Sequence, residues 1–330
     1  MDLATKYLGL SLPHPLIVGA SPLSNDLDMA KRLEDAGAAA IVMQSLFEEQ
    51  ITREQSGTIH DMEEHADSFA EALSYFPHQD DFKLGPENYL EQLGKLKKSL
   101  GIPVIASLNG TTASGWLEYA KQIEAAGANA LELNLYYLPT SPLETGDMVE
   151  RRTLESVRIV KESVKIPVAV KLSPYYSSLP HFTKVLEGAG ADALVLFNRF
   201  LQPDIDIENL EASPKADFTN SKALRLRLRW LAILSGNVKI PMAASGGVHT
   251  AEDVLKAVMA GASAVQMVSA LYLNGPEHIR KVREGLVQWL MEHEYDSLAQ
   301  AKGSMSLEKS PNPASFERAH YMRVLTGWKV

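Results

Sequence analysis

The sequence predicts an α/β protein built as a closed barrel of eight parallel strands, each followed by a helix. Eight short apolar runs alternate with longer segments in which apolar residues recur every three or four positions. Short continuous apolar runs are typical of parallel strands buried on both faces, and the longer pattern is typical of amphipathic helices. Because one barrel of this kind can use all 330 residues, we expect a single (β/α)8 TIM-barrel domain over 1–330.

The eight expected strands follow one another along the whole chain. They lie at 16–20, 39–44, 104–108, 130–135, 168–172, 193–198, 242–245 and 264–269, with helical patterns between them such as 29–34, 89–100, 115–124 and 251–259. The odd-numbered strands follow a proline, and the even-numbered strands follow a Gly-Ala pair. Glycine can end a helix in the left-handed conformation, and proline can begin a strand without loss of a ladder bond, so both mark helix-to-strand turns.

This alternation recurs four times, which indicates equivalent units and favours a closed barrel. The rival fold is a doubly wound open sheet. No Gly-x-Gly-x-x-Gly follows the first expected strand, as a dinucleotide-binding sheet of that type would have.

The spacing of the strands places insertions after strands two, four and six. All three insertions lie at the C-terminal end of the barrel, where barrel enzymes build their active sites. The first, at about 47–87, holds eleven acidic residues together with His60, His65 and His78. These histidines lack the close spacing of metal ligands, so we expect an acidic lid and no metal site. A polar segment at about 295–330 ends on Phe316, Tyr321, Leu325 and Trp328, and is expected to pack as an arm on the barrel or on a second subunit.

Composition excludes several classes of function. Lys plus Arg total 32 against 41 Asp plus Glu, a net charge of −9, so no nucleic-acid partner is expected. With no cysteine, the chain can form no disulfide, thiolate zinc site or iron–sulfur cluster, and redox chemistry would need a cofactor. The longest apolar stretch, 261–273, is too short to span a membrane, and the first residues do not resemble a signal peptide. We therefore expect a cytoplasmic protein without membrane contact.

Lys171 lies late in the fifth expected strand. A buried charge without a partner is costly, so we expect an anionic group to meet it. A desolvated strand lysine can also act as a nucleophile, which leaves a Schiff-base lyase or aldolase open as an alternative function.

The ends of strands seven and eight predict a phosphate site. Gly246 and Gly247 follow strand seven, and Ser269 lies in strand eight, where loops of such barrels recurrently bind phosphate. Glycine lets a ligand approach the backbone closely. Asn134 on strand four and Asn198 at the end of strand six are expected near the same mouth, as polar groups in otherwise apolar strands that need partners.

These segments together resemble the dihydroorotate dehydrogenase family, whose members are FMN-dependent (β/α)8 barrels. The resemblance covers roughly residues 5–300 and rests on motifs in the expected order. They are Leu8-Gly-Leu-Ser-Leu-Pro-His-Pro-Leu16, Glu132-Leu-Asn-Leu135, Val170-Lys-Leu-Ser-Pro174, Asn198, Ser245-Gly-Gly-Val248 and Gln266-Met-Val-Ser-Ala-Leu271.

The resemblance implies a small-molecule substrate, FMN as cofactor, a homodimer and a role for each matching residue. Lys171 corresponds to the lysine beside the pyrimidine edge of the flavin. Asn134 and Asn198 correspond to asparagines at the flavin and substrate, and Ser45 to a serine near the flavin. The phosphate cradle corresponds to Gly246, Gly247, Ser269 and Ala270.

The sequence departs from the family at the catalytic base and the substrate loop. Tyr137 stands where the family has a Cys or Ser base, with Ser141 and Thr140 as replacement candidates, and Gln44 stands where it has a lysine. A phenol is a poor base at neutral pH unless its surroundings help it. With the acidic insertion, these departures predict a substrate less anionic than dihydroorotate, from which an FMN-dependent oxidoreductase would take a hydride at a CH–CH bond. A non-catalytic flavin-binding barrel is the remaining alternative.

Overall fold

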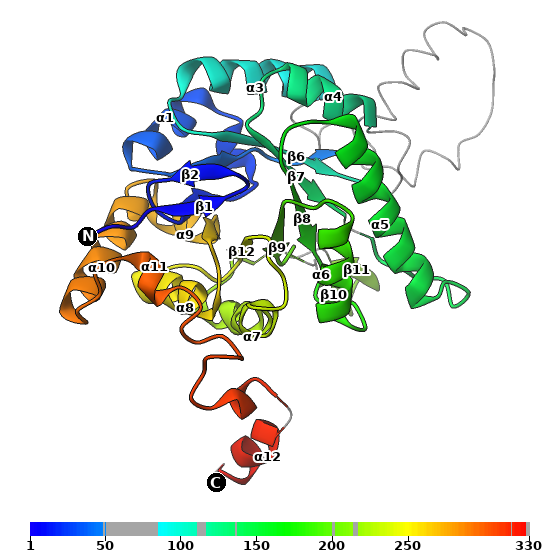
Figure 1. Cartoon of the computed structure of the whole chain (residues 1–330). Coiled ribbons are helices and arrows are strands. Elements are labelled where there is room, and N and C mark those ends of the chain that lie inside the picture. The colour runs from blue at the N-terminus through cyan, green and yellow to red at the C-terminus, as the bar shows by residue number, and fades with distance from the viewer. Residues whose placement is uncertain are drawn as a thin grey trace, which may run out of the picture.

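The computed structural model describes residues 1–48, 50, 85–110, 117–135, 137–199, 202–213, 217–317 and 319–327. Its centre is a closed barrel of parallel strands, which confirms the predicted (β/α)8 fold (Figure 1). The strands in barrel order are β3 (Leu16–Val18), β4 (Ile41–Val42), β6 (Val104–Asn109), β7 (Ala130–Asn134), β8 (Val168–Leu172), β9 (Ala193–Leu196), β12 (Met242–Ser245) and β13 (Ala264–Met267). The ring closes where β13 pairs with β3, and β5 (Leu46–Phe47) extends the second strand along β6.

Helices cover the outside of the ring. They are α1 (Leu27–Asp35), α3 (Pro86–Ser99), α4 (Leu117–Ala125), α5 (Gly146–Ser163), α6 (Leu179–Gly188), α7 (Leu224–Leu234), α8 (Ala251–Ala260), α9 (Ser269–Asn274) and α10 (His278–Glu292). The glycines of the four Gly-Ala pairs all have positive φ, between 93° and 125°, as the sequence predicts for helix ends. Side chains also fix helix starts: Asp26 accepts the Met29 N–H, and Thr250 forms a capping box with Asp253.

Small residues leave room inside the N-terminal end of the barrel. One buried alanine lies near the start of each of five strands: Ala130, Ala169, Ala193, Ala243 and Ala264. The hairpin of β1 (Thr5–Tyr7) and β2 (Leu10–Leu12) packs against them, and its Tyr7, Leu8 and Leu12 join the same buried cluster. The hairpin therefore closes this end of the barrel and leaves the C-terminal end for a ligand (Figure 1).

The three expected insertions differ in how much of them the structure describes. Most of the acidic insertion, with His60, His65 and His78, lies outside the described residues. The insertion after β9 contains the short hairpin of β10 (Asp204–Asp206) and β11 (Glu211–Ser213). In the C-terminal arm, the Met305 N–H donates to the Met259 carbonyl at 2.8 Å and the Leu307 N–H to the Ala232 carbonyl at 2.9 Å.

The arm contains α11 (Leu298–Ala301) before these contacts and α12 (Ala319–Thr326) after them. The second of these helices lies apart from the barrel in Figure 1. Tyr321 and Leu325 on α12 are exposed, and Trp328 lies outside the described residues.

The turn of the N-terminal hairpin carries a strained leucine. Leu8 has φ +52° and is followed by Gly9 at φ +69°, and the Leu8 side chain is 0% exposed. A positive φ is unfavourable for a leucine, so burial in the barrel floor must outweigh the strain. Leu210, at φ +56° in the β10–β11 turn, has the same strain but is 86% exposed.

These two leucines form a matched pair for a stability test. Leu8→Gly relieves the strain but removes a buried side chain, and we expect it to lower the free energy of unfolding by about 2–5 kcal/mol. Leu210→Gly relieves a similar strain without loss of burial, so it should change that free energy by less than about 1 kcal/mol. Urea unfolding followed by circular dichroism measures both. Equal effects would contradict the conclusion that the β1–β2 hairpin stabilises the barrel by closing its N-terminal end.

His14 lies between the hairpin and the first barrel strand. Its Nδ1 accepts the Leu16 N–H at 3.3 Å. Burial, and to a lesser extent the positive charge of Arg283, lowers the pKa of His14 to about 4, while a hydrogen bond to the Gly37 backbone opposes the change. The folded protein therefore keeps this imidazole neutral in mildly acidic solution.

This pKa makes stability depend on pH in a definite direction. Between pH of about 6.5 and 4 the unfolded chain binds a proton that folded His14 does not, so stability falls as the pH falls. From pH 7 to pH 5 the loss due to His14 should be about 2 kcal/mol. Denaturant unfolding at pH 7 and pH 5 measures this loss in the free energy of unfolding. We expect the loss in wild type and in the control His181→Asn, whose histidine is exposed, and we expect it to be absent in His14→Asn. An equal loss in all three proteins would exclude His14 as its source.

Candidate functional site

A cavity of about 440 Å³ opens at the C-terminal ends of the barrel strands. This size lies in the range of small-molecule sites. Its lining comes from the ends of β3, β8, β9, β12 and β13 and from the start of α9, with Arg227 of α7 at one wall. The lining residues are Ala20, Ser21, Pro22, Lys171, Phe197, Asn198, Arg199, Phe218, Thr219, Arg227, Ser245, Gly246, Gly247, Val248, Gln266, Val268, Ser269 and Tyr272.

The cavity brings together five of the residues singled out from the sequence. Lys171, Asn198, Gly246, Gly247 and Ser269 all line it, although they come from four different strands or strand ends.

Three further candidates lie outside this lining. Ala270 is buried directly after Ser269. Asn134 is the strand neighbour of Lys171. The Ser45 hydroxyl is 2.8 Å from the Ser107 hydroxyl, next to the second strand.

Lys171 has an internal partner. Its Nζ lies 3.0 Å from Glu132 Oε1, and both side chains are buried. Gln266 donates to the other Glu132 oxygen and places its own Oε1 3.5 Å from Lys171 Nζ. The anion that the sequence led us to expect is thus a carboxylate of the chain itself. Lys171 is held in place at the cavity floor, and its charge alone does not indicate an anionic ligand.

The negative charge of Glu132 also affects the hairpin below. The Tyr7 hydroxyl is buried and has no hydrogen-bond partner among the described residues. Burial, and secondarily the charge of Glu132, raises the pKa of Tyr7 well above its ordinary value. The phenol therefore stays neutral under the ion pair.

Asn134 has an unsatisfied polar atom. Its side chain is buried, and its Oδ1 accepts no hydrogen bond from the residues that the structure describes. An unpaired buried acceptor is costly unless a ligand or water supplies a donor. This is the position where the resemblance places an asparagine at the flavin.

The loop after β12 forms one wall of the cavity. Gly246 and Gly247 both have positive φ, +92° and +83°, which glycine adopts without strain. The Gly247 N–H donates to Thr219 Oγ1 at 3.4 Å, and Thr219 donates from its N–H (3.1 Å) and its hydroxyl (3.0 Å) to Ser269 Oγ. Backbone N–H and hydroxyl groups of this kind can hold a phosphate.

The space beside Gly247 is taken by the chain rather than left open. A Cβ there would lie 2.3 Å from the Leu224 nitrogen and 2.9 Å from the Ala223 carbonyl carbon. We expected glycine here to let a phosphate approach the backbone. The structure explains the glycine at position 247 differently: the loop packs so closely against the first turn of α7 that a side chain would clash with it.

Tyr137 and Ser141 lie on the loop between β7 and α5, and neither is among the described residues that line the cavity. The Tyr137 hydroxyl donates to Glu144 at 2.5 Å, and the Arg152 guanidinium lies 4.1 Å from the centre of the Tyr137 ring and pairs with Glu144. The Tyr137 hydrogen bond, helped by Arg152 and opposed by desolvation, lowers the pKa of Glu144. Ser141 is exposed, and its Oγ accepts the Leu143 N–H within a turn.

Several lining residues could not be found from the sequence. Arg227 stands in the run Leu-Arg-Leu-Arg-Leu-Arg (224–229), where nothing distinguishes it from Arg225 and Arg229, yet those two are exposed and Arg227 is not. Phe218 and Tyr272 stack at the cavity, with ring centres 5.5 Å apart. Both residues come from segments in which no sequence pattern predicts a binding site.

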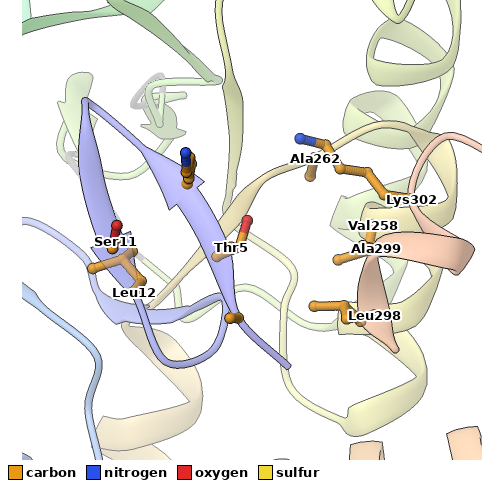
Figure 2. Close-up of a pocket in the computed structure, with 10 residues that line it drawn as sticks. Thr5, Ser11, Leu12, Val258, Ala262, Leu298, Ala299 and Lys302 are labelled. Atoms are coloured by element: carbon orange, nitrogen blue, oxygen red, sulfur yellow. The ribbon is translucent and has the colours of Figure 1, made fainter. Parts of the chain in front are cut away.

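A second cavity of about 300 Å³ lies at the other end of the barrel (Figure 2). It separates the β1–β2 hairpin from α8 and α11, and it contains no histidine or carboxylate among its lining residues. Lys302 there donates to Ser263 Oγ at 2.6 Å. Lys6 and Lys302 are the only titratable side chains among its described lining residues.

Two further findings concern metal ions and membranes. Among the described residues, no group of three or more His, Cys, Asp or Glu side chains could hold a metal ion. None of the described helices is both long and apolar enough to cross a membrane.

A parallel barrel with a glycine loop after strand seven and cations at its cavity is the arrangement with which many (β/α)8 proteins bind phosphate. Comparison with known proteins specifies the class further. The family model described as dihydroorotate dehydrogenase matches residues 3–290, and the chain belongs to this family of oxidoreductases acting on CH–CH bonds. The predicted resemblance is thereby confirmed.

Curated relatives agree with the family assignment. The chain is 27% identical over 305 residues to a protein of Pyrococcus abyssi, which covers 91% of this chain and 98% of that one. It is 30% identical over 235 residues to a protein of Desulforamulus reducens, covering 68% and 75% of the two chains. Both are named dihydroorotate dehydrogenase B (NAD(+)), catalytic subunit.

The packing around Gly247 yields a test by two alanine variants. Gly127 also has positive φ, +93°, but no atom lies within 4 Å of its Cβ position. Gly247→Ala adds a backbone clash to the same conformational strain, so it should lower the melting temperature by several degrees more than Gly127→Ala. Differential scanning calorimetry decides the matter, and equal shifts would show that the loop is free to move away from α7.

Proposed function

We propose that the protein is an FMN-dependent oxidoreductase that oxidises the CH–CH bond of dihydroorotate to give orotate. The observation that carries the proposal is the charge of the cavity. Arg199 and Arg227 line it beside Lys171, which Glu132 already neutralises, and no carboxylate is among its described lining residues, although the whole chain has a net charge of −9. An anionic cofactor and an anionic substrate both suit such a lining.

The residues present fit FMN on two counts. The Asn134 Oδ1 needs a donor, and a flavin ring carries an N–H. The Ser245–Gly247 loop, the Thr219 and Ser269 hydroxyls and a cation lie together at one side of the cavity, as a phosphate group requires. FMN, when bound, supplies the acceptor for the hydride that leaves the substrate carbon.

The chain would contribute a fixed cation and a base. Lys171, held by Glu132 and Gln266, keeps a positive charge at the cavity floor, where negative charge develops during the transfer. The base that removes the substrate proton stays a prediction. Tyr137 is the first candidate because its hydroxyl already donates to a carboxylate and a guanidinium lies over its ring, and Ser141 is the second.

The ion pair argues against the Schiff-base alternative. A Schiff base forms from a free amine, and Glu132 stabilises the charged ammonium of Lys171 instead. A non-catalytic barrel receives no support from any specific contact. The expectation of a less anionic substrate rests on Tyr137, on Gln44 and on the acidic insertion, most of which lies outside the described residues. The cations at the cavity favour dihydroorotate.

The relatives' printed names suggest the route for electrons. They are catalytic subunits of NAD(+)-linked enzymes, and this chain has no cysteine with which to ligate an iron–sulfur cluster. We therefore propose that a separate subunit passes electrons to NAD⁺. A homodimer of this chain and a cytoplasmic location stay predictions.

Anaerobic reduction of the purified protein tests the proposed function. We expect FMN to copurify and dihydroorotate to bleach its visible absorbance in a saturable manner. The neutral analogue dihydrouracil should act at least about tenfold more slowly, because it lacks the carboxylate that a cavity cation can pair with. Faster bleaching by dihydrouracil would contradict the substrate, and a protein that takes up no FMN would contradict the cofactor.

A further inference from the structure

Arg227 differs from the other two cations of the cavity. Lys171 is neutralised by Glu132 at 3.0 Å, and Arg199 is exposed. Arg227 is half-buried, and its partial burial lowers the pKa of its guanidinium. Among the described residues it forms no ion pair. A partly buried charge without a counter-ion is costly, so an anion that enters the cavity would be favoured beside it.

The guanidinium is fixed in one orientation. Its Nε donates to the Ser245 carbonyl at 2.8 Å, and its Nη1 donates to the Ala223 carbonyl at 2.9 Å. These contacts tie the end of β12 to the first turn of α7 and leave the remaining Nη2 edge available. A preorganised guanidinium loses little side-chain entropy when it binds a ligand.

The free edge lies at the glycine loop. Nη2 is 3.0 Å from the position that a Cβ of Gly246 would occupy. One peptide unit further on, the Gly247 N–H reaches Thr219 Oγ1, which is bonded to Ser269. A cation, two hydroxyls and a glycine backbone thus surround one corner of the same cavity.

We propose that Arg227 binds the phosphate group of the flavin nucleotide and makes the site select FMN over riboflavin. The inference rests on the proposed function and adds to it a charged ligand from α7, where the sequence had predicted backbone groups and Ser269 only. The Nη2 edge of Arg227 would donate to the phosphate oxygens, and the Ser269 hydroxyl, which accepts hydrogen bonds from Thr219, would donate its own proton to them. The phosphate dianion would then compensate the half-buried guanidinium, and riboflavin, which lacks the phosphate, would leave it unpaired.

Comparison of FMN with riboflavin separates phosphate binding by Arg227 from a purely structural role, in which its side chain only links Ser245 to Ala223. Apoprotein is titrated with each flavin, and the quenching of flavin fluorescence gives two dissociation constants. In Arg227→Gln we expect the constant for FMN to rise about 10- to 100-fold, since hydrogen bonds to charged groups contribute that much, while the constant for riboflavin changes less than about twofold. Arg229→Gln, an exposed arginine two residues away on the same helix, should leave both constants unchanged.

The other possible results of this titration would contradict the proposed role of Arg227 or of FMN. Equal losses for both flavins would mean that Arg227 only braces Ser245 and Ala223, and no loss for either would remove it from the site. Should Arg227→Gln fail to fold by circular dichroism, wild type still decides: equal affinity for FMN and riboflavin would overturn the inference, and a preference for FMN that weakens with added inorganic phosphate supports it. Wild-type apoprotein that binds neither flavin would overturn the proposed cofactor itself.

Discussion

The buried contact between Lys171 and Glu132 organises the interior of the barrel. Below it, five alanines and apolar side chains of the N-terminal hairpin form one buried cluster. Above it, the strand ends diverge around an open cavity. Two opposite charges can be buried at this level because each is satisfied by the other and by Gln266, which bonds to both. The pair therefore marks the boundary between the part of the barrel that gives stability and the part that binds ligand.

The distribution of charge follows the same division. The chain is acidic as a whole, yet the described lining of its cavity contains arginine and lysine without an acid. An acidic exterior with a basic interior site concentrates the field where an anion binds, since the surrounding apolar walls screen it poorly. The family assignment and the cavity thus agree from independent observations, one from sequence comparison and one from side-chain positions.

Much of the architecture could be predicted from the sequence because local rules govern it. The glycines before the even strands have the positive φ that ends a helix, and the apolar runs are the barrel strands. Lys171, Asn198 and Gly246 were found because polar or glycine residues at strand ends are unusual. Arg227 was missed because its burial depends on the rotation of α7, which local patterns do not define, and the partner of Lys171 was missed because Glu132 lies on another strand.

Closure of the ring has a consequence for biosynthesis. The first barrel strand pairs with the last, Leu16 opposite Val265, and the N-terminal hairpin is tied to that region by the bond from Thr5 Oγ1 to the Ser263 carbonyl. While the ribosome is still making the chain, β3 therefore has one edge without its native partner until β13 has emerged. An open strand edge is a site of wrong pairing. The nascent chain thus carries this open edge through most of its synthesis, until the last barrel strand has emerged.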